Sequence, residues 1–304
     1  ALTKADKLKK SEMTASWKSS ASTCRPPMAD KRGCFDQRPE KGTGYEELPP
    51  SIWMPAVAPE DLTMAYRVLL FYDEFNGAAD YDALFAYVTG ELKAHGIQDG
   101  IVADFGCGTG ELTLMLAQAG YDMIGIDVSE EMLSVLRDKA DALGLPLTNP
   151  MLLCQDLLQL DLYGTIRAAV STFDTYNHIG PLENFEKAIA KAAFFMEKDG
   201  VFVFDLNTPY KHEKVLSGQT FDFDEDDAAC RWSNRYDPQT GRVDLSIDIH
   251  YKDTGEDFHE SFSEYSYPLD TVKALLTRYG FDPVKIADGE SFGPVRPDSQ
   301  RWII

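Results

Sequence analysis

The sequence predicts an α/β fold built on a doubly wound sheet of mostly parallel strands, with a second, antiparallel sheet inserted late in the chain. Short apolar runs alternate with helical patterns between residues 81 and 204. A glycine-rich turn follows the first of these runs. Between residues 221 and 267, apolar and polar side chains alternate with a period of two, which is typical of half-exposed antiparallel strands.

Each element is expected from its own pattern of apolar residues and glycine stops. Helices are expected over 81–92, 112–119, 129–143, 181–196 and 270–279, and core strands over 101–103, 123–126, 151–154, 168–173, 201–204, 283–287 and 301–304. Ser129 and Asp270 have the side chains of N-caps. Turns are expected at 198–200 and 237–241, where glycine follows polar residues.

Composition and charge limit the function. The chain has 304 residues, 44% of them hydrophobic, and 29 basic against 50 acidic side chains, a net charge of −21. The apolar content is enough for a packed core, and a surface this acidic repels phosphate backbones, so we expect no nucleic-acid partner. No stretch approaches 18 consecutive apolar residues, so no membrane partner is expected.

The cysteines and the N-terminal composition suggest a cytoplasmic protein. Five cysteines are widely spaced without a C-x-x-C pair, which predicts neither a disulfide framework nor a metal site. No apolar segment of the kind found in secretory signals occurs near the start. The chain begins with Ala1 and stops within an apolar run, and the sequence alone does not decide whether its ends are truncated or processed.

Four regions are expected. Residues 1–63 carry ten basic and nine acidic side chains without sustained periodicity, and form an extended or disordered N-terminal segment. Residues 64–210 form the ligand-binding core. Residues 211–268 form the inserted antiparallel sheet, expected to make one wall of a substrate pocket, and residues 269–304 complete the core with a helix and strands. The oligomeric state does not follow from the sequence.

The most informative stretch is the loop Asp104–Gly110, D-F-G-C-G-T-G, between the first core strand and its crossover helix. Glycines at every second position allow a tight turn and close approach of a ligand to the main chain. Asp127 ends the second strand about 20 residues later, where a carboxylate can accept both hydroxyls of a ribose. Strand, loop, helix and acid together predict a site for an adenosine-containing ligand.

The same loop argues against a dinucleotide. The pattern G-x-G-x-x-G would require a glycine where this chain has Glu111, and a carboxylate at the helix N-terminus opposes a pyrophosphate. The loop suits a ligand without phosphates. Acids also stand at or just beyond four successive strand ends, Asp104, Asp127, Asp156 and Asp174, which favours a ligand with a cationic end.

Residues from about 65 to 304 resemble a class I S-adenosylmethionine-dependent methyltransferase, and more closely a group of small bacterial methyltransferases of unassigned substrate. The motifs that carry the resemblance are Y-D at 72–73, D-F-G-C-G-T-G at 104–110, G-I-D-V-S-E-E-M-L at 125–133, Q-D-L at 155–157, D-T-Y-N-H at 174–178 and F-D-L-N-T-P-Y-K at 204–211. The resemblance implies a Rossmann-like sheet of seven strands with the last antiparallel, and S-adenosylmethionine as cofactor.

It also implies roles for single residues. Gly106 and Gly108 would line the methionine part, Asp127 the ribose, Asp156 the adenine amino group, and Tyr72 would close over the methionine carboxylate. Val128 and Leu157 would contact the adenine ring. The further residues expected in the cofactor site are Asp104, Cys107, Met132, Gln155, Thr172 and Phe173. Residues 260–267 lack the His and Arg that relatives tend to carry there, so no substrate assignment transfers.

Methyl transfer requires alignment of a nucleophile behind an activated methyl group, and a base only where the acceptor must lose a proton. His178 is the candidate base, since it follows the fourth strand and histidine changes protonation near neutral pH. Tyr176 and Asn177 are candidates for orienting the acceptor.

The leading hypothesis is methyl transfer to a small-molecule acceptor. A non-catalytic protein that binds S-adenosylmethionine, an aminopropyltransferase and a nicotinamide-dependent enzyme on a similar fold are the alternatives.

Overall fold

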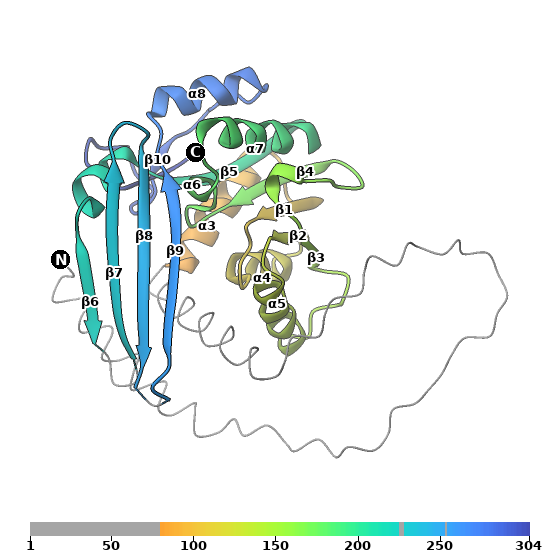
Figure 1. Ribbon diagram of the computed structural model, residues 1–304. Coiled ribbons are helices and arrows are strands. Elements are labelled where there is room, and N and C mark those ends of the chain that lie inside the picture. The colour runs from red at the N-terminus through yellow and green to blue at the C-terminus, as the bar shows by residue number, and fades with distance from the viewer. Residues whose placement is uncertain (1–79, 225–227, 253) are drawn as a thin grey trace, which may run out of the picture. The chain divides into compact units, whose positions relative to one another are not determined.

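The computed structural model describes residues 80–224, 228–252 and 254–304, which form two β-sheets with helices (Figure 1). The predictions for residues 1–63 and for Tyr72 lie outside the described residues. The larger sheet has seven strands in the order β10-β11-β5-β4-β1-β2-β3. Its strands are β1 (Ile101–Phe105), β2 (Asp122–Asp127), β3 (Met151–Cys154), β4 (Ile166–Ser171), β5 (Met196–Asn207), β10 (Ala287–Asp288) and β11 (Arg301–Ile303).

The pairing within this sheet confirms the predicted fold class. The five strands from β3 to β5 pair in parallel, whereas β11 is antiparallel both to β5 and to β10. Strand order reverses between β1 and β4, because β2 and β3 lie on one side of β1 and β4 and β5 on the other. In open α/β sheets ligands bind outside the carboxyl ends of the strands at such a reversal.

Helices cover both faces of the larger sheet. They are α3 (Tyr81–Ala94), α4 (Glu111–Gln118), α5 (Glu130–Ala142), α6 (Thr175–His178), α7 (Leu182–Phe195) and α8 (Leu269–Arg278), with the short η1 (Leu157–Gln159) and η2 (Lys211–Leu216). Val102 packs with apolar side chains of α3 and α4, and its neighbour Ala103 with those of α7 and α8. Because successive strand residues point to opposite faces, the two helix layers lie on opposite sides of the sheet.

The second sheet is the predicted antiparallel insertion. Its strands are β6 (Thr220–Asp224), β7 (Ala228–Asp237), β8 (Arg242–Tyr251) and β9 (Asp257–Tyr265), paired in that order and drawn as four long arrows in Figure 1. The predicted turn closes the β7–β8 hairpin, where the amide of Gly241 donates to the carbonyl of Asp237 at 3.0 Å. Gly241 has φ +70°, a conformation that favours glycine.

Most helix starts and stops follow the sequence, with two local corrections. Ser129 caps α5 as predicted, its hydroxyl accepting from the amide of Met132 at 3.1 Å. Asp270, however, is not the cap of α8: the helix begins one residue earlier, at Leu269, with Pro268 at the cap position. The strand expected over 283–287 is only β10, because the hydrogen bonds to β11 are confined to Ala287 and Asp288.

Candidate active site

The glycine loop follows β1 and is held against β2 by its own backbone. The amides of Gly106 and Cys107 both donate to the carbonyl of Ile126, at 2.7 and 3.0 Å. Gly106, Gly108 and Gly110 have φ values of +73°, +53° and +85°, which glycine adopts without strain. The loop therefore needs glycine at all three positions for its backbone conformation.

The three glycines differ in what surrounds them. A Cβ at Gly106 would lie 2.3 Å from the side chain of Thr175, and one at Gly110 would lie 2.2 Å from Leu136. A Cβ at Gly108 would meet nothing within 4 Å. Gly106 and Gly110 are thus required by packing within the fold, and Gly108 is the position where the loop leaves room for a ligand to approach.

Asp127 lies at the end of β2, as the sequence pattern predicted, and its contact with a ribose stays a prediction. One oxygen accepts the amide of Gly108 and the other the amide of Ser129, both at 2.9 Å. The carboxylate is half-buried, and each oxygen keeps a lone pair for a further donor. The following Val128 is 67% exposed, and Met132 on the first turn of α5 is half-buried. An adenosine beside the loop stays the predicted ligand of these residues.

The residues after β3 have local partners. The side chain of Gln155 is held by the backbone of Asp161, to which it donates at 3.2 Å and from which it accepts at 3.0 Å. One oxygen of Asp156 accepts the amide of Leu158 at 2.8 Å and so caps η1. Asp156 is exposed, while Leu157 is buried. Asp156 can still receive an adenine amino group on its other oxygen.

Asp104 lies within β1 and not beyond its end, and only 3% of it is exposed. Its carboxylate accepts the hydroxyl of Thr113 at 2.5 Å. Burial raises the pKa of Asp104 to about 7, against the lowering effect of that hydrogen bond. The partner of this carboxylate is therefore a residue of the fold. Burial also raises the pKa of the Cys107 thiol, which keeps it protonated and a poor nucleophile.

The segment after β4 turns sharply. Phe173 and Asp174 both have φ +57°, and their amides donate to the two oxygens of Asp205 at 2.8 and 2.7 Å. Arg301 of β11 donates to Asp205 and to Asp174, each at 3.0 Å, and lies over the ring of Phe173. Thr172, just before the turn, is buried, and its carbonyl accepts the hydroxyl of Thr175. Two carboxylates and one guanidinium thus fix this strained turn.

The three candidates for acceptor chemistry occupy different environments. Tyr176 is 1% exposed and packs among Phe185, Phe202 and Phe204 in the core, so its expected role in orienting the acceptor finds no support in its position. Asn177 is fully buried. His178 is exposed, with its Nε2 3.8 Å from an oxygen of Asp174.

Asn177 connects the core to the inserted sheet. Its amide nitrogen donates to the carbonyls of Asn207 and Tyr265, at 3.1 and 2.7 Å, and its oxygen accepts the amide of Asn207 at 2.8 Å. Both N–H donors and the carbonyl oxygen of this side chain therefore form hydrogen bonds within the protein. Asn177 is therefore placed to position its neighbours, and does not face an acceptor.

Sequence reasoning missed the polar residues that surround this turn. Glu264 of β9 accepts from Asn207 at 2.9 Å and contacts Nε2 of His212 at 3.1 Å, and Lys211 donates to Asn207 at 2.8 Å. Asp205, Asn207 and Lys211 belong to the F-D-L-N-T-P-Y-K motif, which was a usable signal. No sequence motif pointed to Arg301 or Glu264, because only the folding of the chain brings these two residues beside the turn after β4.

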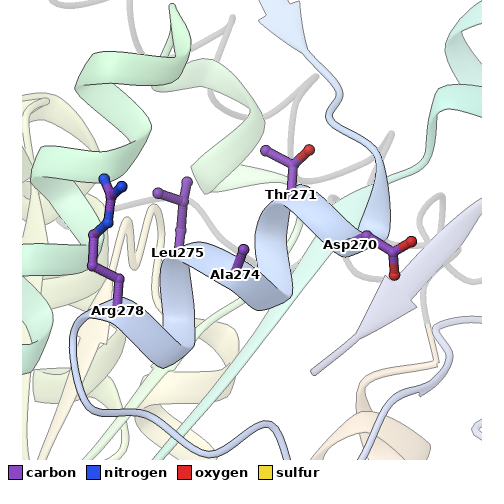
Figure 2. Close-up of a pocket in the computed structure, with 5 residues that line it drawn as sticks. All are labelled: Asp270, Thr271, Ala274, Leu275 and Arg278. Atoms are coloured by element: carbon purple, nitrogen blue, oxygen red, sulfur yellow. The ribbon is translucent and has the colours of Figure 1, made fainter.

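Two hollows occur elsewhere on the described surface. One of about 380 Å³ runs along α8, and Figure 2 shows its lining side chains on that single helix, Arg278 and Leu275 among them. The other, about 580 Å³, lies on the inserted sheet between Arg235 and Phe262. Neither hollow is lined by residues of the glycine loop or of the turn after β4.

Comparisons with known proteins decide the family. A family model described as a methyltransferase domain matches residues 102–200. A protein of Geobacillus sp. (strain WCH70), provisionally named a methyltransferase, is 26% identical over 73% of this chain and 91% of its own length. A methyltransferase domain thus spans residues 102–200, and the predicted resemblance of the chain to class I S-adenosylmethionine-dependent methyltransferases is confirmed.

Solved structures agree on the fold. A S-adenosylmethionine-dependent methyltransferase from Clostridium acetobutylicum aligns with a TM-score of 0.72 at 24% identity, covering 79% of this chain and 97% of that one. The sugar N-methyltransferase KedS8 from Streptoalloteichus aligns with a TM-score of 0.60 at 18% identity, covering 86% and 98%. The predicted Rossmann-like architecture of this methyltransferase is thereby confirmed.

Glu111 at the start of α4 pairs with Lys139 of α5 at 2.7 Å, so its charge is partly offset and opposes a pyrophosphate less than expected. The match of residues 102–200 to a methyltransferase domain, and not Glu111, is what argues against the nicotinamide-dependent alternative. In the part of the chain that is described, no helix is both long and apolar enough to cross a bilayer.

Proposed function

We propose that this methyltransferase transfers the methyl group to a small-molecule acceptor bound between the glycine loop, α6 and β9. The observation that carries the proposal is the contact of Gly106 with Thr175, since a Cβ at Gly106 would lie 2.3 Å from that side chain. Thr175 begins α6 and His178 ends it, three residues later, so both lie on neighbouring positions of one helical face. The candidate base is thus within one turn of the cofactor loop.

Each part of the arrangement has a chemical task. When bound, S-adenosylmethionine supplies a methyl group activated by its sulfonium sulfur. Gly108 and Asp127 hold the ligand, and α6 with β9 aligns the acceptor nucleophile and excludes water, effects that are together worth roughly 7–11 kcal/mol in oriented reactions. His178 takes a proton from an acceptor that must lose one. Phe262, whose ring centroid lies 5.2 Å from that of His178, forms an apolar wall.

Charge and fold support a small acceptor. The net charge of −21 opposes nucleic acid. KedS8, which shares this fold, is named as a sugar N-methyltransferase, so the architecture is compatible with acceptors of sugar size.

The test is transfer of label from methyl-tritiated S-adenosylmethionine into a cell extract that has been separated by ultrafiltration. We expect label in the small-molecule fraction. Label only in retained protein or nucleic acid would overturn the proposal. Cofactor binding without labelling of either fraction would favour a non-catalytic protein.

A further inference from the structure

Three polar side chains from distant parts of the chain converge beside α6: Asp174, His178 and Glu264. One oxygen of each acid and one ring nitrogen of the histidine all lie within 4.8 Å of one another. The exposed fraction of the side chain falls from 43% at His178 through 19% at Asp174 to 5% at Glu264. The group, called here the 174–178–264 cluster, therefore opens to solvent at the histidine and is closed at the glutamate.

Each acid of this cluster uses only one oxygen for the fold. Arg301 donates to Oδ1 of Asp174, and Asn207 and His212 share Oε2 of Glu264. Within the described parts of the chain, the remaining oxygens, Oδ2 of Asp174 and Oε1 of Glu264, receive no hydrogen bond. Glu264 is thus a buried carboxylate that keeps one oxygen able to accept a further donor.

The charges around the cluster do not balance. Three carboxylates, Asp174, Asp205 and Glu264, face two cationic side chains, Arg301 and Lys211. Burial, together with the charge of Arg301, lowers the pKa of Lys211. The two histidines that face the same space, His178 and His212, add charge only when protonated. With both neutral, the site is short of one positive charge.

We infer that the 174–178–264 cluster binds the ammonium group of the methyl acceptor, and that the acceptor is a primary or secondary amine. The inference rests on the proposed function and specifies its substrate class. An ammonium supplies one positive charge and at least two N–H donors. Those properties match one missing charge and two unfilled carboxylate oxygens.

A divalent metal fits the same cluster less well. It would bring two positive charges where one is missing, close to Arg301 and Lys211. The ammonium satisfies the cluster with hydrogen bonds at ordinary length.

The transfer step follows from the same geometry. The bound ammonium gives one proton to a ring nitrogen of His178, which frees a lone pair on the amine nitrogen. That nitrogen forms a bond to the methyl carbon as the carbon–sulfur bond breaks, and the sulfur keeps the bonding electron pair. The product is a methylated ammonium, still paired with Glu264 and Asp174, and the proton on His178 leaves to solvent through its exposed face.

The first test compares acceptors that share a carbon skeleton but differ in one group, such as phenethylamine and phenethyl alcohol, or glucosamine and glucose. Formation of S-adenosylhomocysteine is measured for each. We expect turnover of amines to exceed that of their hydroxyl partners by about a hundredfold or more, because a site built for a donor rejects the analogue that lacks it. Turnover of hydroxyl, thiol or carboxylate acceptors alone would leave the proposed function standing and overturn the amine. No turnover in any class by a chain that binds the cofactor would overturn both.

The second test does not depend on finding the natural acceptor. The imidazole resonance of His178, assigned with His178→Gln, is followed by NMR in the presence of S-adenosylhomocysteine while n-propylammonium chloride or n-propanol is added at matched ionic strength. We expect a saturable shift with the ammonium alone, lost in Glu264→Gln and in Asp174→Asn. Glu260→Gln, an exposed acid on the same strand, is the matched control and should keep the shift.

The outcomes of the second test are equally decisive. An equal response to propanol, no response to either probe, or a shift retained in a folded Glu264→Gln chain would overturn the inference. A saturable response to Zn²⁺ alone, lost in the same two variants, would also overturn it and mark a metal site. Thermal unfolding of each variant separates loss of binding from loss of fold.

Discussion

The two sides of the candidate active site are assembled in different ways. The cofactor side is local: the glycine loop, Asp127 and Asp156 lie on three consecutive strand ends within about fifty residues. The acceptor side is made by four distant segments, which contribute Asp174, Asn207, Glu264 and Arg301. A local motif can be read from sequence, whereas a site made by long-range contacts becomes visible only in the folded chain.

The two sides also differ in how their polar groups are satisfied. On the cofactor side the backbone supplies the partners, as with the amides of Gly108 and Ser129 on Asp127. On the acceptor side, side chains bind one another, and two carboxylate oxygens remain without a hydrogen bond within the described residues. We therefore expect the cofactor side to be fixed before any ligand binds, and the acceptor side to depend on a cation for full satisfaction.

The largest effect is expected from the packing of the glycine loop. Gly110→Ala places a methyl group 2.2 Å from Leu136 at φ +85°, and combines steric overlap with backbone strain for a loss of about 4 kcal/mol in unfolding free energy. Gly108→Ala causes backbone strain without steric overlap, so we expect a loss of only about 1–2 kcal/mol in unfolding free energy. Its methyl group, however, fills the space left for the ligand. Urea unfolding and calorimetry with S-adenosylhomocysteine should separate them. Equal stability of the two variants would contradict the distinction between packing and binding glycines.

Asp104 gives the cofactor side a pH dependence. Its pKa is raised to about 7, so between about pH 4 and about pH 7 the unfolded chain has lost a proton that the folded chain keeps. Stability from this group is present below about pH 4 and is lost as the pH rises, by up to about 4 kcal/mol. Asp104→Asn removes this pH-dependent loss of stability, and its amide oxygen can still accept the hydroxyl of Thr113. The difference in unfolding free energy between variant and wild type should therefore grow from about pH 4 to about pH 7, and parallel pH profiles would refute it.

The connection between core and inserted sheet should be the weak point of the acceptor side. Asn177→Ala removes the partner of three backbone groups, two buried ones of Asn207 and a half-buried one of Tyr265, for an expected loss of about 3 kcal/mol in unfolding free energy. Asn184→Ala, which removes one half-buried hydrogen bond on α7, should cost less than about 1 kcal/mol. Similar losses in urea unfolding would show that Asn177 does not hold the two parts together.

Most of the fold could be predicted because its signals are short in range. Apolar periodicity and glycine stops located α3, α4, α5 and α7 and the strands from β1 to β4, and the Ser129 cap was predicted to the residue. The strand expected over 283–287 failed since its pairing depends on β11, which lies beyond a long connection. Strand length at a sheet edge is decided by the partner and not by the residues alone.

The candidate site divides along the same line. The positions of Gly108, Asp127, Val128 and Leu157 agree with the cofactor roles predicted for them, which remain predictions until binding is measured. Tyr176 and Asn177 were grouped with His178 because they are adjacent in sequence. A one-turn helix sends adjacent side chains in different directions, and two of the three are buried. Sequence proximity therefore did not predict the orientation of Tyr176 and Asn177, and the role of His178 stays a prediction.

Calorimetric titration with S-adenosylhomocysteine, on wild type, Asp127→Ala and Glu264→Gln, tests the separation of the two sides most directly. Loss of two charge-assisted hydrogen bonds predicts at least about hundredfold weaker binding to Asp127→Ala. Asp122→Ala, an exposed acid at the opposite end of β2, should bind as wild type does, and so should Glu264→Gln. Equal weakening in Glu264→Gln and Asp127→Ala, with both chains folded, would contradict the account.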